Sequence, residues 1–263
     1  MCCTFGDQTD IEWWKKYNLP LKNIFTNDGH IINSIEKYGG LSIKEARKQI
    51  IEDLNAEGYL VKVEELEHEV QVHERCGKEV EYSVMKQWFI DIMNHKKDFL
   101  KIGEEIKWHP EHMHNRYDEW VNNVAWDWCI SRQRYFGVPF PVWYCKDCGE
   151  PIFARKEDLP VNPLAQQPHT DKCPKCGCDA SKLQQDPDVL DTWFSSWLWP
   201  FSTLGWPEKT PDLDRFYPTT ALVTGFDIIF FWVARMIMAG LEFTGKAPFH
   251  DIYMHGLVRD KQG

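Results

Sequence analysis

The sequence predicts an α/β protein whose last third belongs to a parallel sheet. Apolar runs at 220–223 and 252–257 flank a helical stretch at 227–241, and a strand, a crossover helix and a second strand form the usual unit of a parallel sheet. Two Cys-x-x-Cys pairs precede this unit. The 263 residues are 43% hydrophobic and 27% charged, which is the composition of a folded globular chain.

Charge and hydropathy restrict the class of protein. Lys+Arg 30 and Asp+Glu 40 give a net charge of −10, which argues against a protein that coats nucleic acid or binds anionic membranes. No run approaches the roughly 20 apolar residues of a membrane span, and the first residues lack the features of a signal peptide. We expect a cytoplasmic, monomeric protein whose nine cysteines bind metal or stay reduced.

Local signals predict the other elements. Thr9 or Asp10 is placed to cap a helix over 11–17. Ser42 and Glu45 match a capping box that opens a second helix, which Gly58 ends. The remaining expected elements are a strand that begins at 61–65, an extended stretch that passes into a helix over 81–92, and a strand over 138–144.

The two Cys-x-x-Cys pairs indicate a metal site. Each pair is followed by glycine, which lets the chain turn so that both thiolates reach one ion. Four thiolates are the ligand set of a tetrahedral, structural Zn²⁺ site and leave no position open for a catalytic water. We therefore expect one structural zinc ion on Cys145, Cys148, Cys173 and Cys176. The alternatives are a redox-active pair of cysteines or free thiols that bind no metal.

A second, incomplete pattern precedes them. His73 and Cys76, followed by Gly77, have the spacing of half a knuckle. Two ligands do not make a structural site. Either their partners lie elsewhere, or the two are ordinary surface and core residues.

Four segments of the chain resemble the valyl-tRNA synthetases, a family of class I aminoacyl-tRNA synthetases. They are WCISRQRYFG at 128–137, DVLDTWFSS at 188–196, LVTGFDIIFFWVARM at 222–236 and YMHGLVRD at 253–260. Isoleucyl-tRNA synthetases are related, but they typically have a Gly-x-Asp-Gln type of sequence where this chain has Gly225-Phe-Asp-Ile. The resemblance therefore favours the valyl family.

The resemblance implies a central slice of a longer enzyme that uses valine, ATP, Mg²⁺ and valine tRNA. The ATP-binding signatures His-x-Gly-His and Lys-Met-Ser-Lys-Ser do not occur in the sequence, so we assign no catalytic residue and expect no activity from this slice alone. The expected parts are a remnant of the editing domain at 1–40, a connector at 41–135, a zinc-ribbon connector at 136–187, and the second half of a class I nucleotide-binding, Rossmann-like sheet at 188–263.

The resemblance also implies binding residues. Asp227, which follows the turn at Gly225, is expected to face the ammonium group of valine. Trp193, Ile228 and Trp232 are expected to surround the side chain of the bound valine. The residue spacing is equally compatible with a buried face of the crossover helix. His255 and Gly256 end a strand at the carboxyl edge, where parallel sheets bind ligands, and the resemblance places them beside the adenylate.

An editing role is implied for the first residues. An apolar valine pocket rejects threonine by only about 100-fold, and the family hydrolyses mischarged threonine at a second site. Asp7 and Asp10 match the acidic pair of that site, although Asp10 is equally well explained as a helix cap. In many relatives, a Cys-x-x-Cys stands where this chain has His73 and Cys76, with its partner pair upstream.

Two other functions stay open at this point. One is a fragment of an isoleucyl-tRNA synthetase. The other is a non-catalytic zinc-ribbon protein that binds nucleic acid, which predicts tRNA binding by this chain with a steep salt dependence.

Overall fold

The computed structural model describes residues 8–65, 67, 70, 72–73 and 76–263. The chain divides into two compact units, residues 1–86 and 87–263. Their boundary falls within the predicted connector 41–135, and the functional assignment of that segment stays a prediction. In the described ranges, no helix is both long enough and apolar enough to cross a membrane.

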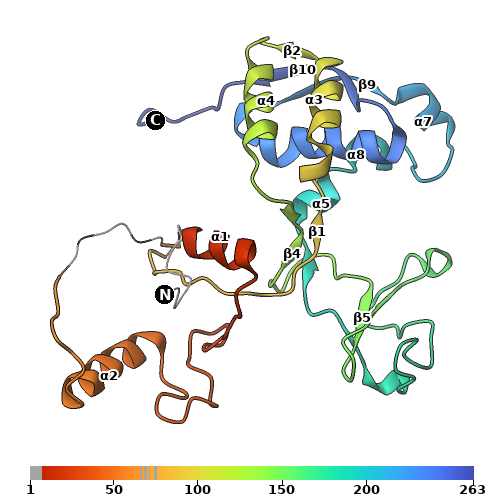
Figure 1. Cartoon of the computed structure of the whole chain (residues 1–263). Coiled ribbons are helices and arrows are strands. Elements are labelled where there is room, and N and C mark those ends of the chain that lie inside the picture. The colour runs from red at the N-terminus through yellow and green to blue at the C-terminus, as the bar shows by residue number, and fades with distance from the viewer. Residues whose placement is uncertain (1–7, 66, 68–69, 71, 74–75) are drawn as a thin grey trace. The chain divides into compact units, whose positions relative to one another are not determined.

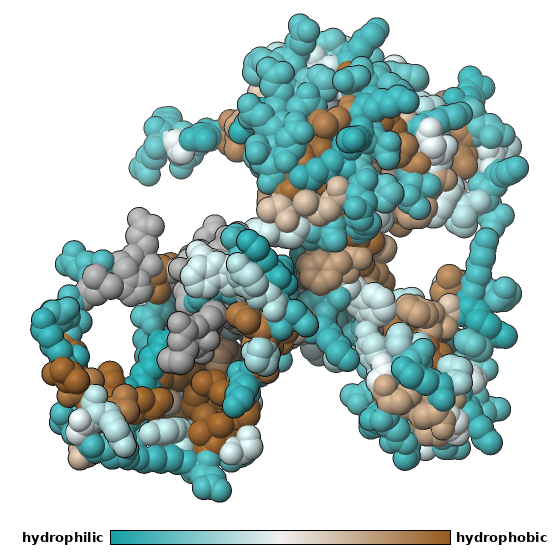
Figure 2. Space-filling model, in the orientation of Figure 1, coloured by the Kyte–Doolittle hydropathy of each residue, from teal (hydrophilic) through white to brown (hydrophobic). Residues whose placement is uncertain are grey.

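The first unit has two helices, α1 (Gln8–Tyr17) and α2 (Ile43–Ala56). The capping box is confirmed, because Ser42 Oγ accepts from the Glu45 N–H at 3.3 Å and Glu45 Oε2 accepts from the Ser42 N–H at 3.0 Å. Gly58 follows the helix and has φ +77°, the left-handed conformation that glycine commonly adopts just after the end of a helix. Of the apolar side chains on α2, only Ala46 is buried, and Figure 2 shows hydrophobic residues gathered over this helix.

Two expectations for this unit are wrong. Helix α1 begins at Gln8, so Asp10 lies within its first turn and does not cap it. The stretch 61–65 forms no strand. No described residue pairs with this stretch, and pairing decides whether a short extended run becomes part of a sheet.

The second unit contains the predicted parallel sheet. Strands β2 (Lys107–His109), β9 (Thr219–Gly225) and β10 (Phe249–His255) lie in the order β2-β10-β9, and both pairings are parallel. This confirms the strand–helix–strand prediction for the last third of the chain. Helices α3 (Lys96–Glu104) and α4 (Met113–Asn123) pack on each other, and α3 also contacts α8 (Ala234–Thr244) (Figure 1).

The crossover between β9 and β10 is not one regular α-helix. It begins with a 3₁₀ turn, η4 (Phe226–Ile228), continues as a π-helical turn, η5 (Ile229–Val233), and only then becomes α8. Single π-turns inside helices occur frequently at functional sites. The helix predicted at 227–241 therefore exists, but its first two turns place side chains differently from an α-helix.

Helices on one side make the two faces of this sheet unequal. Trp108 and Ile252 are buried against the helices, whereas Val223 and Tyr253 on the opposite face are 65% and 45% exposed. The core beneath the sheet is rich in aromatic side chains, including Tyr117, which has no exposed surface. Short helices α5 (Thr192–Ser196), α6 (Trp199–Ser202) and α7 (Pro211–Phe216) complete this part of the unit.

Two short antiparallel pairs and a small sheet make up the rest of the unit. The pairs are β1 (Phe89–Ile90) with β3 (Trp128–Cys129), and β4 (Ser131–Arg132) with β8 (Val189–Leu190). The small sheet has the antiparallel order β6-β5-β7, from β5 (Val142–Cys145), β6 (Pro151–Phe153) and β7 (Leu183–Gln185). Three 3₁₀ turns remain, η1 (Met93–His95), η2 (Lys156–Asp158) and η3 (Ala180–Lys182).

Two elements begin later in the chain than the sequence predicts. The strand predicted at 138–144 is confirmed only as β5, from Val142 onward, because Pro139 and Pro141 cannot donate to a strand ladder. The stretch 81–92 stays extended as far as β1, and α3 begins only at Lys96, so the helix expected before residue 92 is wrong.

Candidate functional site

The four predicted zinc ligands meet in one cluster. The sulfur atoms of Cys145, Cys148, Cys173 and Cys176 all lie within 4.8 Å of one another. Two of the sulfur pairs, Cys145 with Cys176 and Cys148 with Cys173, are 3.6 Å apart. Four thiolates bound tetrahedrally at 2.3 Å from zinc are separated by about 3.8 Å. The sulfur positions therefore fit this ion.

Glycine turns and backbone N–H groups favour the thiolate form of two of the four cysteines, Cys145 and Cys173. The glycine after each pair has a positive φ, +71° at Gly149 and +73° at Gly177, and its N–H donates to the carbonyl of the first cysteine of the pair, at 2.8 and 2.9 Å. Burial disfavours the thiolate of Cys145, but backbone N–H groups of Cys148 and Asp147 outweigh it and lower its pKa to about 6. The N–H of Cys176 likewise lowers the pKa of Cys173.

A fifth sulfur atom, that of Cys178, lies beside the cluster. The sequence analysis did not predict it there. Cys178 Sγ is 3.3 Å from Cys145 Sγ. Its hydrogen bond with Cys145, together with burial, raises the pKa of Cys178 to about 12. The Cys-x-Cys spacing from 176 to 178 was the available signal.

The half knuckle is formed but incomplete. His73 Nδ1 lies 3.4 Å from Cys76 Sγ, and the Gly77 N–H donates to the His73 carbonyl at 2.8 Å. Both side chains are exposed. Among the residues that the structure describes, the four-cysteine cluster is the one group of three or more metal-ligating side chains, so His73 and Cys76 have no further ligand there.

Of the acidic pair predicted for editing, the structure describes only Asp10. Asp7 lies outside the described residues. Asp10 lies in the first turn of α1.

Four predicted binding residues meet at the carboxyl edge of the sheet. Gly225 and His255 are paired across β9 and β10, and Gly256 follows directly. A Cβ atom on Gly225 would lie 2.5 Å from Oδ1 of Asp227, so the carboxylate folds back over this glycine. The His255 Nδ1–H donates to the Gly256 carbonyl at 2.8 Å, which leaves Nε2 as an acceptor.

The predicted aromatic residues lie where α5 packs against η5. The ring of Trp193 stacks on Phe231, with ring centroids 5.9 Å apart and planes at 23°. Trp232 Nε1 donates to the carbonyl of Ser196 at 3.3 Å. Sequence reasoning missed Phe231 because it assumed an α-helical face through 228 and 232, whereas this turn is π-helical.

A buried charge cluster lies next to α5. Asp191 pairs with Arg132, Oδ2 to Nη2, at 2.6 Å. Burial lowers the pKa of Arg235 to about 10, and the Asp191 carboxylate opposes this shift. The sequence analysis singled out none of these three residues, because no local pattern shows that distant segments approach the same carboxylate.

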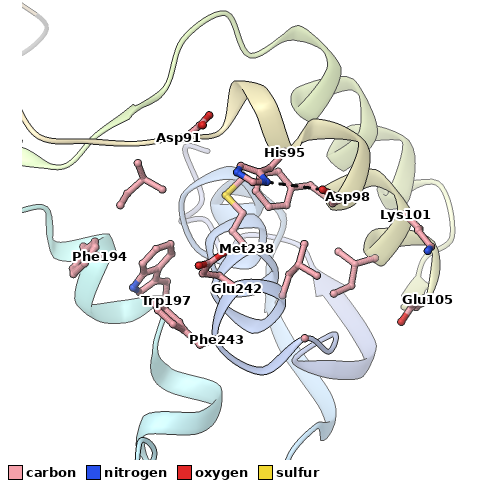
Figure 3. Close-up of a pocket in the computed structure, with 15 residues that line it drawn as sticks. Asp91, His95, Asp98, Lys101, Glu105, Phe194, Trp197, Met238, Glu242 and Phe243 are labelled. Atoms are coloured by element: carbon pink, nitrogen blue, oxygen red, sulfur yellow. Dashed lines mark ion pairs between the residues drawn. The ribbon is translucent and has the colours of Figure 1, made fainter.

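A cavity of about 680 Å³ lies between α3, α5 and α8. Figure 3 shows Phe194, Trp197, Met238 and Phe243 as its apolar lining, with acidic residues such as Glu242 among the side chains around it. None of the predicted binding residues lines this cavity. It is therefore distinct from the predicted binding residues, which we call the sheet-edge site: Trp193, Gly225, Asp227, Ile228, Trp232, His255 and Gly256.

Comparison with known proteins identifies the family to which the chain belongs. The family model described as tRNA synthetases class I (I, L, M and V) matches residues 11–263. The chain belongs to this family of class I aminoacyl-tRNA synthetases.

Within the family, the chain is similar to valine–tRNA ligases. It is 51% identical to the valine–tRNA ligase of Treponema denticola, over 98% of this chain and 27% of that protein. It is 46% identical to the valine–tRNA ligase of Thermoplasma volcanium, over 100% of this chain and 32% of that protein. The chain thus spans about a third or less of these relatives. A methionyl-tRNA synthetase structure from Mycobacterium tuberculosis, bound by methionyl-adenylate, has a TM-score of 0.44 at 17% identity and covers 73% of this chain and 30% of its own.

Proposed function

We propose that this chain is part of a valine–tRNA ligase, which activates valine with ATP in the presence of Mg²⁺ and transfers it to valine tRNA. The similarity to valine–tRNA ligases over nearly the whole chain is the observation on which the proposal rests. The slice supplies the amino-acid pocket and a structural metal. The ATP-binding signatures of the family do not occur in the printed sequence, so we expect no activity from these 263 residues alone.

In this proposal, Asp227 binds the ammonium group of valine and three apolar side chains surround its isopropyl group. Asp227 is exposed, and in the described part of the chain no side chain forms an ion pair with it. The apolar side chains are Trp193, Ile228 and Trp232. The stacking of Trp193 on Phe231 and the hydrogen bond of Trp232 to Ser196 support a fixed wall, and Gly225 leaves the space that the carboxylate occupies.

His255 and Gly256 are proposed to contact the adenosine of the adenylate. Their position at the carboxyl ends of parallel strands supports this role, since open α/β sheets bind ligands there. With Nδ1 donating to the backbone, His255 offers Nε2 as an acceptor.

We further propose that Cys145, Cys148, Cys173 and Cys176 hold one zinc ion in a zinc-ribbon connector over 136–187. The ion would join two turns that β5 and β7 alone hold weakly. Residues 188–263 are then the second half of the nucleotide-binding domain, 41–135 a connector and 1–40 a remnant of the editing domain with Asp7 and Asp10. The cytoplasm is the expected compartment.

The decisive test is ATP–pyrophosphate exchange by the intact polypeptide that carries this segment. We expect exchange with valine and a preference for valine over isoleucine of roughly 10- to 200-fold. This is the discrimination that one methylene group provides in a fitted pocket. Replacing Asp227 by Asn is expected to raise KM for valine and leave KM for ATP unchanged. Preferential exchange with isoleucine would contradict the proposal.

A second experiment separates the non-catalytic alternative. If the chain were a nucleic-acid-binding zinc ribbon, the isolated 263 residues would bind tRNA with a salt slope of several phosphate contacts. The net charge of −10 favours weak binding or none. Filter binding at several salt concentrations distinguishes the two.

A further inference from the structure

Asp191 is a buried carboxylate, 5% exposed, between β8 and α5. Its Oδ2 accepts from Arg132 Nη2 at 2.6 Å and from Trp128 Nε1 at 3.1 Å. Its Oδ1 accepts from the backbone N–H of Trp193 at 3.2 Å. The Asp191 N–H in turn donates to the Ile130 carbonyl at 2.8 Å. One side chain therefore joins the segment 128–132 to the first turn of α5.

The surroundings of this carboxylate allow few other arrangements. Arg132 uses its other terminal nitrogen, Nη1, for the carbonyls of Cys129 and Ser131, at 2.9 and 2.8 Å. The guanidinium of Arg235 lies 4.1 Å from the ring centroid of Trp128. Asp191 thus forms an ion pair with Arg132, and its negative charge also favours the charged form of Arg235. Removal of that anion leaves positive charge without compensation, which is strongly unfavourable in a protein interior.

The position of α5 sets the position of two residues proposed for the amino-acid pocket. Trp193 lies two residues after Asp191, and the ring of Trp193 stacks on Phe231. Ser196, at the other end of this short helix, accepts the hydrogen bond from Trp232 Nε1. A shift of α5 would therefore move the ring of Trp193 and the acceptor of Trp232 together.

We propose that Asp191 is a positioning residue for the amino-acid pocket. It fixes α5 against the segment 128–132, and thereby sets the distance between Trp193 and the η5 turn that bounds the space for the substrate side chain. Asp191 itself does not touch the substrate. This inference rests on the proposed function, because it assumes that Trp193 lines the valine pocket.

The test compares Asp191→Asn with Asp188→Asn in the intact polypeptide that carries this segment. Asn keeps the size of the side chain and an oxygen that can cap α5, but it loses the charge and one acceptor. Asp188 is the matched control, since it lies three residues away, is only partly buried and pairs with Gln133 at 2.8 Å. KM and kcat are measured for valine and for ATP in pyrophosphate exchange.

We expect Asp191→Asn to raise KM for valine at least about tenfold, since misplacement by an ångström can cost up to about 100-fold, while KM for ATP changes less than about twofold. Asp188→Asn should change neither. A role in stability alone would lower the active fraction, and so kcat, without changing KM for valine, and that result would overturn the inference. If the wild-type protein shows no exchange with valine, the proposed function fails instead.

A milder variant covers the case in which Asp191→Asn does not fold. Trp128→Phe removes one N–H donor to Oδ2 and leaves the pair of Asp191 with Arg132 intact. We expect KM for valine to rise about two- to fivefold, with KM for ATP unchanged. An unchanged KM for valine in this folded variant would equally overturn the inference.

Discussion

The cysteine cluster and the sheet-edge site are built from the sequence in different ways. Each half of the cluster is one tight turn, from Cys145 to Gly149 and from Cys173 to Gly177, and the two turns repeat the same hydrogen bond and the same positive φ. The sheet-edge site takes its residues from α5, from η4 and η5, and from the end of β10. Local turns create the first site, whereas only the completed fold creates the second.

The difference predicts how each region responds to change. We expect the cluster made of turns to depend on the proposed zinc ion, because the small sheet β6-β5-β7 buries few large side chains around Trp143 and Ile152. A site at the edge of a larger sheet depends on the packed core beneath it. Metal removal should therefore disrupt the first region and leave the second folded.

The largest effect is expected from replacing Cys145 and Cys148 by Ser. Structural zinc contributes roughly 10–16 kcal/mol of apparent binding free energy in small zinc modules, far more than the small sheet can supply. The variant should contain less than about one tenth of the metal of the wild type, and hydrogen exchange should show β5 and β7 unprotected while β10 stays protected.

Cys178→Ser is the control for this experiment. Its sulfur lies 3.3 Å from Cys145 but is not one of the four clustered ligands, so zinc content should stay near one ion per chain. His73→Ala with Cys76→Ala should also leave it unchanged. Loss of zinc in Cys178→Ser, measured by metal analysis, would show that the ligand assignment is wrong.

The second prediction concerns Tyr117, beneath the sheet. Burial, followed by the nearby charge of Asp118, raises the pKa of Tyr117 well above its ordinary value near 10. The folded state therefore keeps the proton while the unfolded chain loses it. Stability from this group is complete below pH 10 and falls above it by about 1.4 kcal/mol per pH unit.

Tyr117→Phe removes this pH dependence. The variant also loses the hydrogen bond from the hydroxyl to the Phe99 carbonyl, 2.9 Å long, which costs about 0.5–1.5 kcal/mol at neutral pH. The variant should be less stable at pH 8 and gain on the wild type above pH 10, as measured by urea unfolding. Parallel pH profiles for the two proteins would contradict the assignment.

The third prediction concerns the aromatic contacts of the sheet-edge site. Trp232→Phe keeps a ring but removes the Nε1–H that donates to Ser196. We expect a loss of about 0.5–1.5 kcal/mol in the free energy of unfolding. The matched control is Trp199→Phe, because Trp199 is 60% exposed. Equal losses in both variants would mean that the bond to Ser196 contributes nothing.

The same contrast explains what the sequence could predict. The capping box of α2, the parallel strands β9 and β10 and the four clustered cysteines follow from patterns that each segment shows by itself: the cap residues, two apolar runs on either side of a helix, and two Cys-x-x-Cys pairs. The stacking of Trp193 on Phe231 and the pairing of Asp191 with Arg132 do not. They depend on a π-helical turn and on the approach of segments about 60 residues apart, neither of which has a local pattern.

The smallest effect on stability is expected from Gly225→Ala, which tests the sheet-edge site directly. The added Cβ would lie 2.5 Å from Oδ1 of Asp227. Because Asp227 is exposed, its carboxylate can rotate away at a cost of at most about 1 kcal/mol. Unfolding should change little, but the carboxylate then leaves the position from which it is proposed to bind the substrate ammonium.

Gly256→Ala is the matched control, since a Cβ there meets no atom within 4 Å. Gly256 is itself proposed to contact the adenosine, so the two variants should separate by ligand. Gly225→Ala should raise KM for valine about tenfold or more with KM for ATP unchanged, and Gly256→Ala should affect valine less than ATP. If Gly225→Ala leaves KM for valine unchanged in the intact protein, the Asp227 carboxylate does not bind the amino group from this position, and the proposed valine pocket is wrong.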